Sequence, residues 1–124
     1  MREAIGAVII KNGYILLVQK KKTWILPGGK PELDESDIKC LSRELREELQ
    51  VRLKNPRRLD DKFIGTTPNK GDLLCVRIYL AEIEGEIIPS AEIKAAEWTK
   101  APESYNLSDI TRKVIYFLYQ KGYL

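Results

Sequence analysis

Residues 28–51 read GGKPELDESDIKCLSRELREELQV and join a glycine-containing loop to a segment with the periodicity of an amphipathic helix. The apolar residues of this segment recur at helical spacing: Ile38, Leu41, Leu45 and Leu49. Either Asp34 or Ser36 can cap the start of the helix, and Asp37 suits the positive end of the helix dipole. The stretch therefore predicts a loop that ends near Asp34 and a helix from Ser36 to about Leu49.

The predicted helix carries three carboxylates on one face. At 100° per residue, Glu44, Glu47 and Glu48 fall within an arc of about 100° beside the apolar stripe. Like charges at this spacing repel one another, and a hard divalent cation would offset the repulsion. Residues 28–51 hold seven acids and four bases, a net charge of −3, whereas the rest of the chain holds 11 acids and 17 bases and carries +6. This distribution favours an acidic metal site that attracts a polyanion; the alternative is a solvated helix face whose acids pair with Arg43 and Arg46.

Outward from this stretch, apolar segments alternate with turn-forming residues. A hairpin is predicted over residues 4–18, because Asn12-Gly13 suits a type I′ turn. Further extended segments are predicted at residues 24–26, 58–66, 72–84, 86–88 and 95–99, with a turn at 67–71. A helix from about Ser108 to Gln120 closes the chain, with Ser108 as its N-cap. This order predicts an α/β (α+β) fold, an αβα sandwich with a mixed β-sheet between helices, in a single domain of residues 1–124.

The composition excludes several kinds of chemistry. The 124-residue chain has no histidine, which rules out Ser-His and Cys-His nucleophiles and histidine-ligated zinc. Cys40 and Cys75 are 35 positions apart and fit neither a disulfide scaffold nor a metal knuckle, so free thiols in the cytoplasm are expected. The N-terminal apolar run is too short to span a membrane, and a net charge of +3 is too small to indicate a nucleic-acid polymer as partner. Acid-base or metal chemistry must therefore come from carboxylates, lysines, tyrosines or the backbone.

The spacing of the residues in this stretch resembles the Nudix box, G-x5-E-x7-R-E-U-x-E-E-x-G-U, in which U is an aliphatic residue. Gly29, Glu35 and the run from Arg43 to Val51 match every fixed position except the last glycine, where this chain has Gln50. Glycine at this position can end the helix in the left-handed backbone conformation, which has a positive φ. Gln50 must either extend the helix or adopt the left-handed conformation at some cost in free energy. The order of elements also resembles the Nudix αβα sandwich over essentially the whole chain.

The resemblance implies a pyrophosphohydrolase that acts on a nucleoside diphosphate linked to another group, with Mg²⁺ or Mn²⁺ as cofactor. It implies that Arg43 orients Glu44 and that Glu35 supports the geometry of the loop and helix. The residues expected to be catalytic are Arg43, Glu44, Glu47 and Glu92. The expected metal ligands are the Gly28 carbonyl, Glu44, Glu47, Glu48 and Glu92. Glu97 is the alternative to Glu92, and either Glu44 or a late-loop glutamate is the expected general base.

Four further residues are expected to contact the substrate: Trp24, Lys30, Arg77 and Tyr79. Trp24 can stack on a base or belong to the core, and Arg77 and Tyr79 can meet phosphate and base or form a solvated strand face. Lys20–Lys22 can steer anions or be a plain surface run.

The preferred substrate is a nucleoside triphosphate, cleaved to a monophosphate and pyrophosphate by attack of water at phosphorus. The alternatives are ADP-ribose, dinucleoside polyphosphates and a Nudix-like module that binds nucleotides without chemistry. The oligomeric state stays open, a homodimer included, because Nudix proteins often dimerise.

Overall fold

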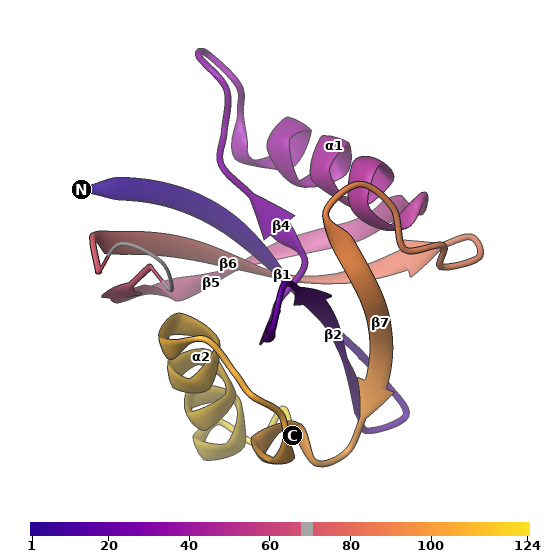
Figure 1. The fold of residues 1–124 in the computed structure, drawn as a ribbon, viewed down its shortest axis with the longest axis vertical. Coiled ribbons are helices and arrows are strands. Elements are labelled where there is room, and N and C mark those ends of the chain that lie inside the picture. The colour runs from indigo at the N-terminus through magenta and orange to yellow at the C-terminus, as the bar shows by residue number, and fades with distance from the viewer. Residues whose placement is uncertain (68–70) are drawn as a thin grey trace.

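The computed structural model describes residues 1–67 and 71–124, with only the backbone described at 60 and 61. Figure 1 shows α1 and α2 on opposite sides of the strands, which confirms helices on two faces of a sheet. The strands are β1 (Arg2–Lys11), β2 (Tyr14–Lys20), β3 (Thr23–Ile25), β4 (Gly28–Gly29), β5 (Arg52–Thr66), β6 (Leu73–Glu84) and β7 (Ile93–Thr99). The helices are α1 (Asp37–Leu49), a short 3₁₀ turn (Pro102–Ser104) and α2 (Asp109–Gln120).

The sheet is mixed, as predicted. Its main path runs β3-β2-β1-β6-β5, while β4 pairs with β1 and β7 pairs with β2. Only the β1–β6 pair is parallel among the strand pairs of the described residues, with Ile5 opposite Arg77 and Gly6 opposite Ile78. On its other side, β1 pairs with the short strand β4, so that Ile5 also lies opposite Gly29. The central strand β1 therefore connects the glycine loop to β6.

The core consists of two apolar layers, one on each face of the sheet. Alternate residues of β1 enter different layers: Ile5, Ala7 and Ile9 pack with the buried face of α1, whereas Val8 packs with α2. Residues 5 and 7–9 of this strand are almost inaccessible to solvent, because both faces of the strand are covered. Helix α1 contributes Cys40, Leu41, Leu45 and Leu49 to its layer.

Several local predictions are confirmed. In the β1–β2 hairpin both Asn12 (φ 53°) and Gly13 (φ 82°) have positive φ, as a type I′ turn requires. Ser36 caps α1 by accepting the Lys39 N–H at 3.2 Å, and Ser108 caps α2 by accepting the Thr111 N–H at 3.3 Å. No helix among the described residues combines the length and the apolar character that crossing a membrane requires.

The strand predicted at residues 86–88 is wrong, because these residues lie in a loop instead. The loop supplies hydrogen-bond donors to the end of α1: the Ile88 N–H donates to the Leu49 carbonyl at 2.9 Å and the Ser90 N–H donates to the Glu48 carbonyl at 2.8 Å. Strand β5 also begins earlier than predicted, at Arg52 instead of residue 58. Of the turn predicted at 67–71, residues 68–70 lie outside the described part of the chain.

Gln50 takes the left-handed conformation, the second of the two alternatives, with φ 58° and ψ 36°. Its N–H donates to the Arg46 carbonyl at 3.0 Å, and its side-chain amide donates to Ser90 Oγ at 2.8 Å. The helix therefore ends where the motif places a glycine, and the side chain of Gln50 ties that end to the loop after β6.

Candidate active site

A cavity of about 600 Å³ lies between the carboxylate face of α1, strand β4 and the start of α2. Its polar end is lined by Lys20, Lys21, Gly28, Gly29, Lys30, Glu44, Glu47, Glu48 and Glu92. Its other end is mostly apolar and is lined by residues of the sheet and of α2, among them Ala4, Gly6, Leu74, Val76, Ile78, Ile110 and Val114. At the polar end alone, the structure brings together residues that are up to 72 positions apart in the chain, from Lys20 to Glu92.

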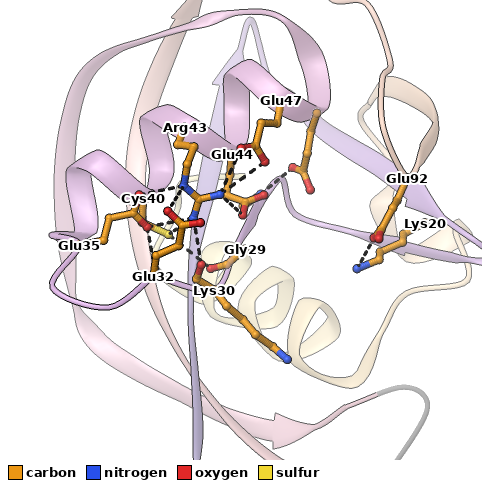
Figure 2. A network of polar contacts seen from close by, with 12 residues as sticks. Lys20, Gly29, Lys30, Glu32, Glu35, Cys40, Arg43, Glu44, Glu47 and Glu92 are labelled. Atoms are coloured by element: carbon orange, nitrogen blue, oxygen red, sulfur yellow. Dashed lines mark hydrogen bonds and ion pairs between the residues drawn. The ribbon is translucent and has the colours of Figure 1, made fainter.

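Arg43 organises the carboxylates at the polar end, as Figure 2 shows. Its guanidinium donates to both Glu35 oxygens, at 2.8 and 2.9 Å, and to Glu44 Oε1 at 3.0 Å. Longer contacts of 3.4 Å reach Glu47, and Nη2 donates to the Lys30 carbonyl at 3.1 Å. The paired guanidinium lowers the pKa of the Glu35 carboxyl to about 2, so this acid stays ionised. Arg43 thus contacts both Glu35 and Glu44, and the roles that the family resemblance implies for Arg43 and Glu35 stay predictions.

Glu44 lies directly against the backbone of Gly29. A Cβ atom on Gly29 would overlap the Glu44 carboxyl group, so any larger residue here would force that carboxyl out of its position. The side chain of Glu44 is 16% exposed, and burial raises the pKa of its carboxyl in spite of Arg43. A partly buried carboxylate of raised basicity is suited to accept a proton.

Glu48 is held by the loop instead of by an arginine. Its Oε1 accepts the Gly28 N–H at 3.1 Å, and burial raises the pKa of its carboxyl to about 7. Gly28 has φ 144°, and a Cβ atom there would overlap the Ile5 carbonyl, so only glycine fits between Glu48 and β1. The expected metal-binding role of the Gly28 carbonyl stays a prediction.

Of the two late glutamates, only Glu92 lines the cavity. It pairs with Lys20 Nζ at 2.9 Å, and this ion pair lowers the pKa of the Glu92 carboxyl. Figure 2 shows this pair apart from the Arg43 cluster. Glu97 instead accepts the Tyr105 hydroxyl at 2.6 Å. The geometry therefore favours Glu92 over Glu97 as the fourth acid of the site.

The acids of the cavity have the chemistry of a site for a hard divalent cation. Glu44, Glu47 and Glu48 offer oxygen ligands, which Mg²⁺ and Mn²⁺ prefer. Glu48 is buried without an ion pair to a cationic side chain in the described part of the chain, and a bound cation would offset that burial. Within the described residues, no three acidic or cysteine side chains converge on one point as they lie. Arg43 holds Glu44 and Glu47, while Gly28 holds Glu48. The donor set thus fits the implied cofactor.

Three of the four expected substrate contacts do not line this cavity. Trp24 packs edge-on against Tyr105, with ring centroids 5.0 Å apart, while its neighbours Thr23 and Ile25 line the cavity because side chains alternate along β3. Arg77 and Tyr79 both bind Asp37 at the start of α1. Lys30 alone of the four reaches the cavity, together with Lys20 and Lys21. Trp24, Arg77 and Tyr79 thus lie outside the lining of this cavity, and their expected contact with substrate stays a prediction.

Sequence reasoning also missed residues at the apolar end. Ser108 and Thr111 line the cavity there, and the Ser108 hydroxyl donates to Thr111 Oγ1 at 2.8 Å. The sequence marked Ser108 as a helix cap, which it is, but gave no signal that the first turn of α2 faces the cavity. Only the packing of α2 on β1 and β6 reveals this.

Comparisons with known proteins agree with this fold and site. The model of the NUDIX domain family matches residues 1–117. A CTP pyrophosphohydrolase of Escherichia coli (strain K12) is 44% identical over 57 residues, which are 41% of this chain and 42% of that relative. The matched segment thus spans less than half of the relative's length.

Two solved structures cover nearly the whole chain. A crystal structure of a MutT NUDIX hydrolase from Burkholderia pseudomallei has a TM-score of 0.80 at 27% identity and covers 92% of this chain and 95% of that chain. A solution structure of the E. coli ORF135 protein has a TM-score of 0.76 at 26% identity and covers 96% of this chain and 91% of that chain. With a family model that matches residues 1–117 and a fold shared along more than nine-tenths of these chains, this protein belongs to the Nudix hydrolase family.

Proposed function

We propose that this chain is a metal-dependent pyrophosphohydrolase that cleaves nucleoside triphosphates to a monophosphate and pyrophosphate. One observation carries the proposal: a single cavity of about 600 Å³ joins a cluster of acids and lysines to an apolar compartment. The first part suits a metal and phosphates, and the second suits a nucleoside. Residues 1–124 act in this proposal as one domain, and the expected cytoplasmic location and homodimer stay predictions.

The metal would be held by Glu44, Glu47, Glu48 and Glu92, with the Gly28 carbonyl as a further ligand. When bound, Mg²⁺ or Mn²⁺ supplies Lewis acidity to the phosphate oxygens and lowers the pKa of the attacking water. Water oxygen bonds to phosphorus while the anhydride P–O bond breaks, and the bond electrons leave with the pyrophosphate. The proton of the water passes to a carboxylate, either Glu44 or Glu92.

The remaining side chains at the polar end position the substrate. Lys20, Lys21 and Lys30 line the cavity beside the acids, and their positive charges attract the phosphate oxygens. Arg43 holds Glu44 by its contact at 3.0 Å, so its role is to keep the catalytic carboxylate in place. Direct attack by water needs no covalent intermediate on the protein, so the reaction does not require a histidine-activated nucleophile, which this chain lacks.

The apolar end supports a nucleoside. Leu74, Val76 and Ile78 of β6 and Ile110 and Val114 of α2 give this end an aliphatic lining. The name of the E. coli relative, a CTP pyrophosphohydrolase, puts CTP first among the substrates to test. ADP-ribose and dinucleoside polyphosphates are the alternatives.

The proposal is tested by incubating the protein with Mg²⁺ and a panel of the four ribonucleoside triphosphates, their deoxy forms, ADP-ribose and dinucleoside polyphosphates. We expect release of pyrophosphate from a triphosphate, and a loss of about 100-fold or more in kcat for Glu47→Gln. Glu86→Gln, an exposed loop residue outside the cavity lining, is the matched control and should keep full activity. Tight nucleotide binding by calorimetry without turnover of any substrate would contradict the proposal and indicate a binding module.

A further inference from the structure

The start of α1 is attached to the sheet by a carboxylate whose two oxygens are both occupied. Arg77 on β6 donates to Asp37 through Nε and Nη2, each at 2.9 Å, and the Tyr79 hydroxyl donates to Asp37 Oδ2 at 2.8 Å. Such a bidentate arginine-carboxylate pair fixes the orientation of the carboxylate as well as its distance. Residues 77 and 79 are two apart on one strand, so they present both donors on the same face of the sheet.

This contact is well shielded from solvent. The side chains of Arg77 and Asp37 are 16% and 21% exposed, and Arg77 also lowers the pKa of the Asp37 carboxyl. Tyr79 is buried beneath α1 with Leu41 and Leu45. The three polar side chains therefore form a defined contact and differ from a solvated surface pair, which contributes little.

A second set of contacts attaches α1 on the opposite side. Glu44 packs on Gly29, and Glu48 accepts the Gly28 N–H at 3.1 Å. Ile5 of β1 pairs with Gly29 on one side and with Arg77 on the other. The two attachment points on the sheet thus lie on one transverse row, two strand spacings or about 10 Å apart.

The apolar core holds α1 on the sheet, whereas these two attachments oppose rotation of α1 about its own axis. The contacts of Cys40, Leu41, Leu45 and Leu49 hold α1 on the sheet, but apolar contacts have no preferred direction. A rotation of α1 about its axis would move Glu44, Glu47 and Glu48 relative to β4. The hydrogen bonds of Asp37 oppose such a rotation, because they must break before the helix turns.

We propose that Asp37, Arg77 and Tyr79 are positioning residues that set the rotation of α1 and thereby aim the acids of the site at β4. The inference rests on the proposed function, since it concerns the affinity of the acids for a divalent metal. None of the three residues lines the cavity, so each acts through the helix and not on the substrate. The rival interpretation is that the three residues stabilise the fold and have no effect on the site.

Binding of Mn²⁺ alone, followed by electron paramagnetic resonance, separates the two interpretations. We expect the dissociation constant for Mn²⁺ to rise about 10-fold in Asp37→Asn and in Arg77→Met, and no further in the double variant, because both remove the same contact. Arg77→Lys keeps the charge but not the bidentate geometry, so it should fail to restore wild-type affinity. Tyr79→Phe removes one hydrogen bond and should retain the fold while raising the dissociation constant about 3-fold.

The matched control is Glu3→Gln. Glu3 accepts a hydrogen bond from Arg77 Nη1 at 2.6 Å but has no hydrogen bond or ion pair to α1 in the described structure, and its side chain is 58% exposed. This variant should bind Mn²⁺ within 2-fold of wild type. If Asp37→Asn and Tyr79→Phe lower the melting temperature while Mn²⁺ affinity stays at the wild-type value, the positioning role is wrong although the proposed function stands. If the wild-type protein itself binds no Mn²⁺, both are wrong.

Discussion

Glu48 differs from the other acids of the site in what controls its ionisation. Glu35 is paired with Arg43, and the pKa of its carboxyl falls to about 2. Among the described residues, the Gly28 N–H is the one hydrogen-bond donor to Glu48, and burial raises the pKa of its carboxyl to about 7. At neutral pH, and without a cation, roughly half of the Glu48 side chains therefore carry a proton.

The raised pKa of the Glu48 carboxyl makes the metal-free protein less stable as the pH rises. The pKa of Glu48 is higher in the folded state, about 7, than its ordinary value of 4.5, so its contribution to the free energy of unfolding is greatest below pH 4.5 and is lost as the pH rises through 7. Between pH 5 and pH 8 the loss is about 2–3 kcal/mol. We expect Glu48→Gln to remove this loss in urea denaturation with EDTA. Identical pH dependence in wild type and Glu48→Gln would contradict the prediction, and Glu86→Gln is the control.

The sequence predicts a residue's surroundings well when its partners are close to it in the chain, and poorly when they come from another element. Glu44, Glu47 and Glu48 lie within one and a half turns of a helix, so their shared face follows from helical periodicity alone. Arg77 and Tyr79 were placed correctly on one face of a strand, but periodicity does not say which layer covers that face. In the structure α1 covers this face, and both side chains bind Asp37 of that helix.

At the level of elements, the end of α1 depends on a loop that is distant in sequence. Gln50 adopts φ 58°, which costs a residue with a Cβ atom about 1 kcal/mol relative to glycine. Its side-chain amide donates to Ser90 Oγ at 2.8 Å, and this bond offsets part of the cost. The departure from the family motif is thus accompanied by a contact that glycine cannot make.

Two substitutions of Gln50 separate the cost of its left-handed conformation from the gain of its hydrogen bond to Ser90. Gln50→Ala loses the hydrogen bond to Ser90 and keeps the backbone strain, so the free energy of unfolding should fall by about 1 kcal/mol. Gln50→Gly loses the same bond but relieves the strain, so it should be about 1 kcal/mol more stable than Gln50→Ala. Chemical denaturation of the three proteins measures both differences. Equal stability of the Ala and Gly variants would show that the left-handed conformation carries no cost here.

The elements that sequence patterns predicted wrongly are those whose pairing depends on distant segments. Residues 86–88 have the composition of a strand, but the Ile88 N–H donates to a carbonyl at the end of α1 instead of to a neighbouring strand. Strand β5 passes Pro56, which usually interrupts a strand, because it lies at the edge of the sheet and shifts its register between Lys54 and Arg57. The hairpin at Asn12-Gly13 and the two helix caps involve neighbouring residues only, and these predictions are confirmed.

Over the whole molecule, the acids of the site lie within a chain of opposite net charge. Residues 28–51 carry −3 and the remainder carries +6. Lys20 and Lys21 belong to the remainder, yet the fold brings them to the cavity that the acids line. The overall fold class could be predicted from the order of elements, whereas the apolar end of the cavity could not, because α2 and β6 meet only in three dimensions.

The charge distribution predicts a salt-dependent reaction. Since a nucleoside triphosphate is a polyanion, kcat/KM should fall about 3- to 10-fold between 20 and 200 mM NaCl, mainly through KM. Lys21→Gln should weaken this dependence, because it removes a cation that lines the cavity. Lys121→Gln, at the end of α2 and outside the cavity lining, should leave it unchanged. Steady-state kinetics at several salt concentrations measure the slopes, and equal slopes in wild type and Lys21→Gln would contradict the prediction.

The loop after β6 connects two parts of the site through hydrogen bonds to the end of α1. Ile88 and Ser90 donate their N–H groups to the last carbonyls of α1, and Glu92 follows two residues later. When these bonds open, the final turn of the helix loses its hydrogen-bond partners at the same time as the loop is released. We therefore expect the last turn of α1, which carries Glu48, and the loop that carries Glu92 to open together, so that a local opening there would disturb acids from both segments at once.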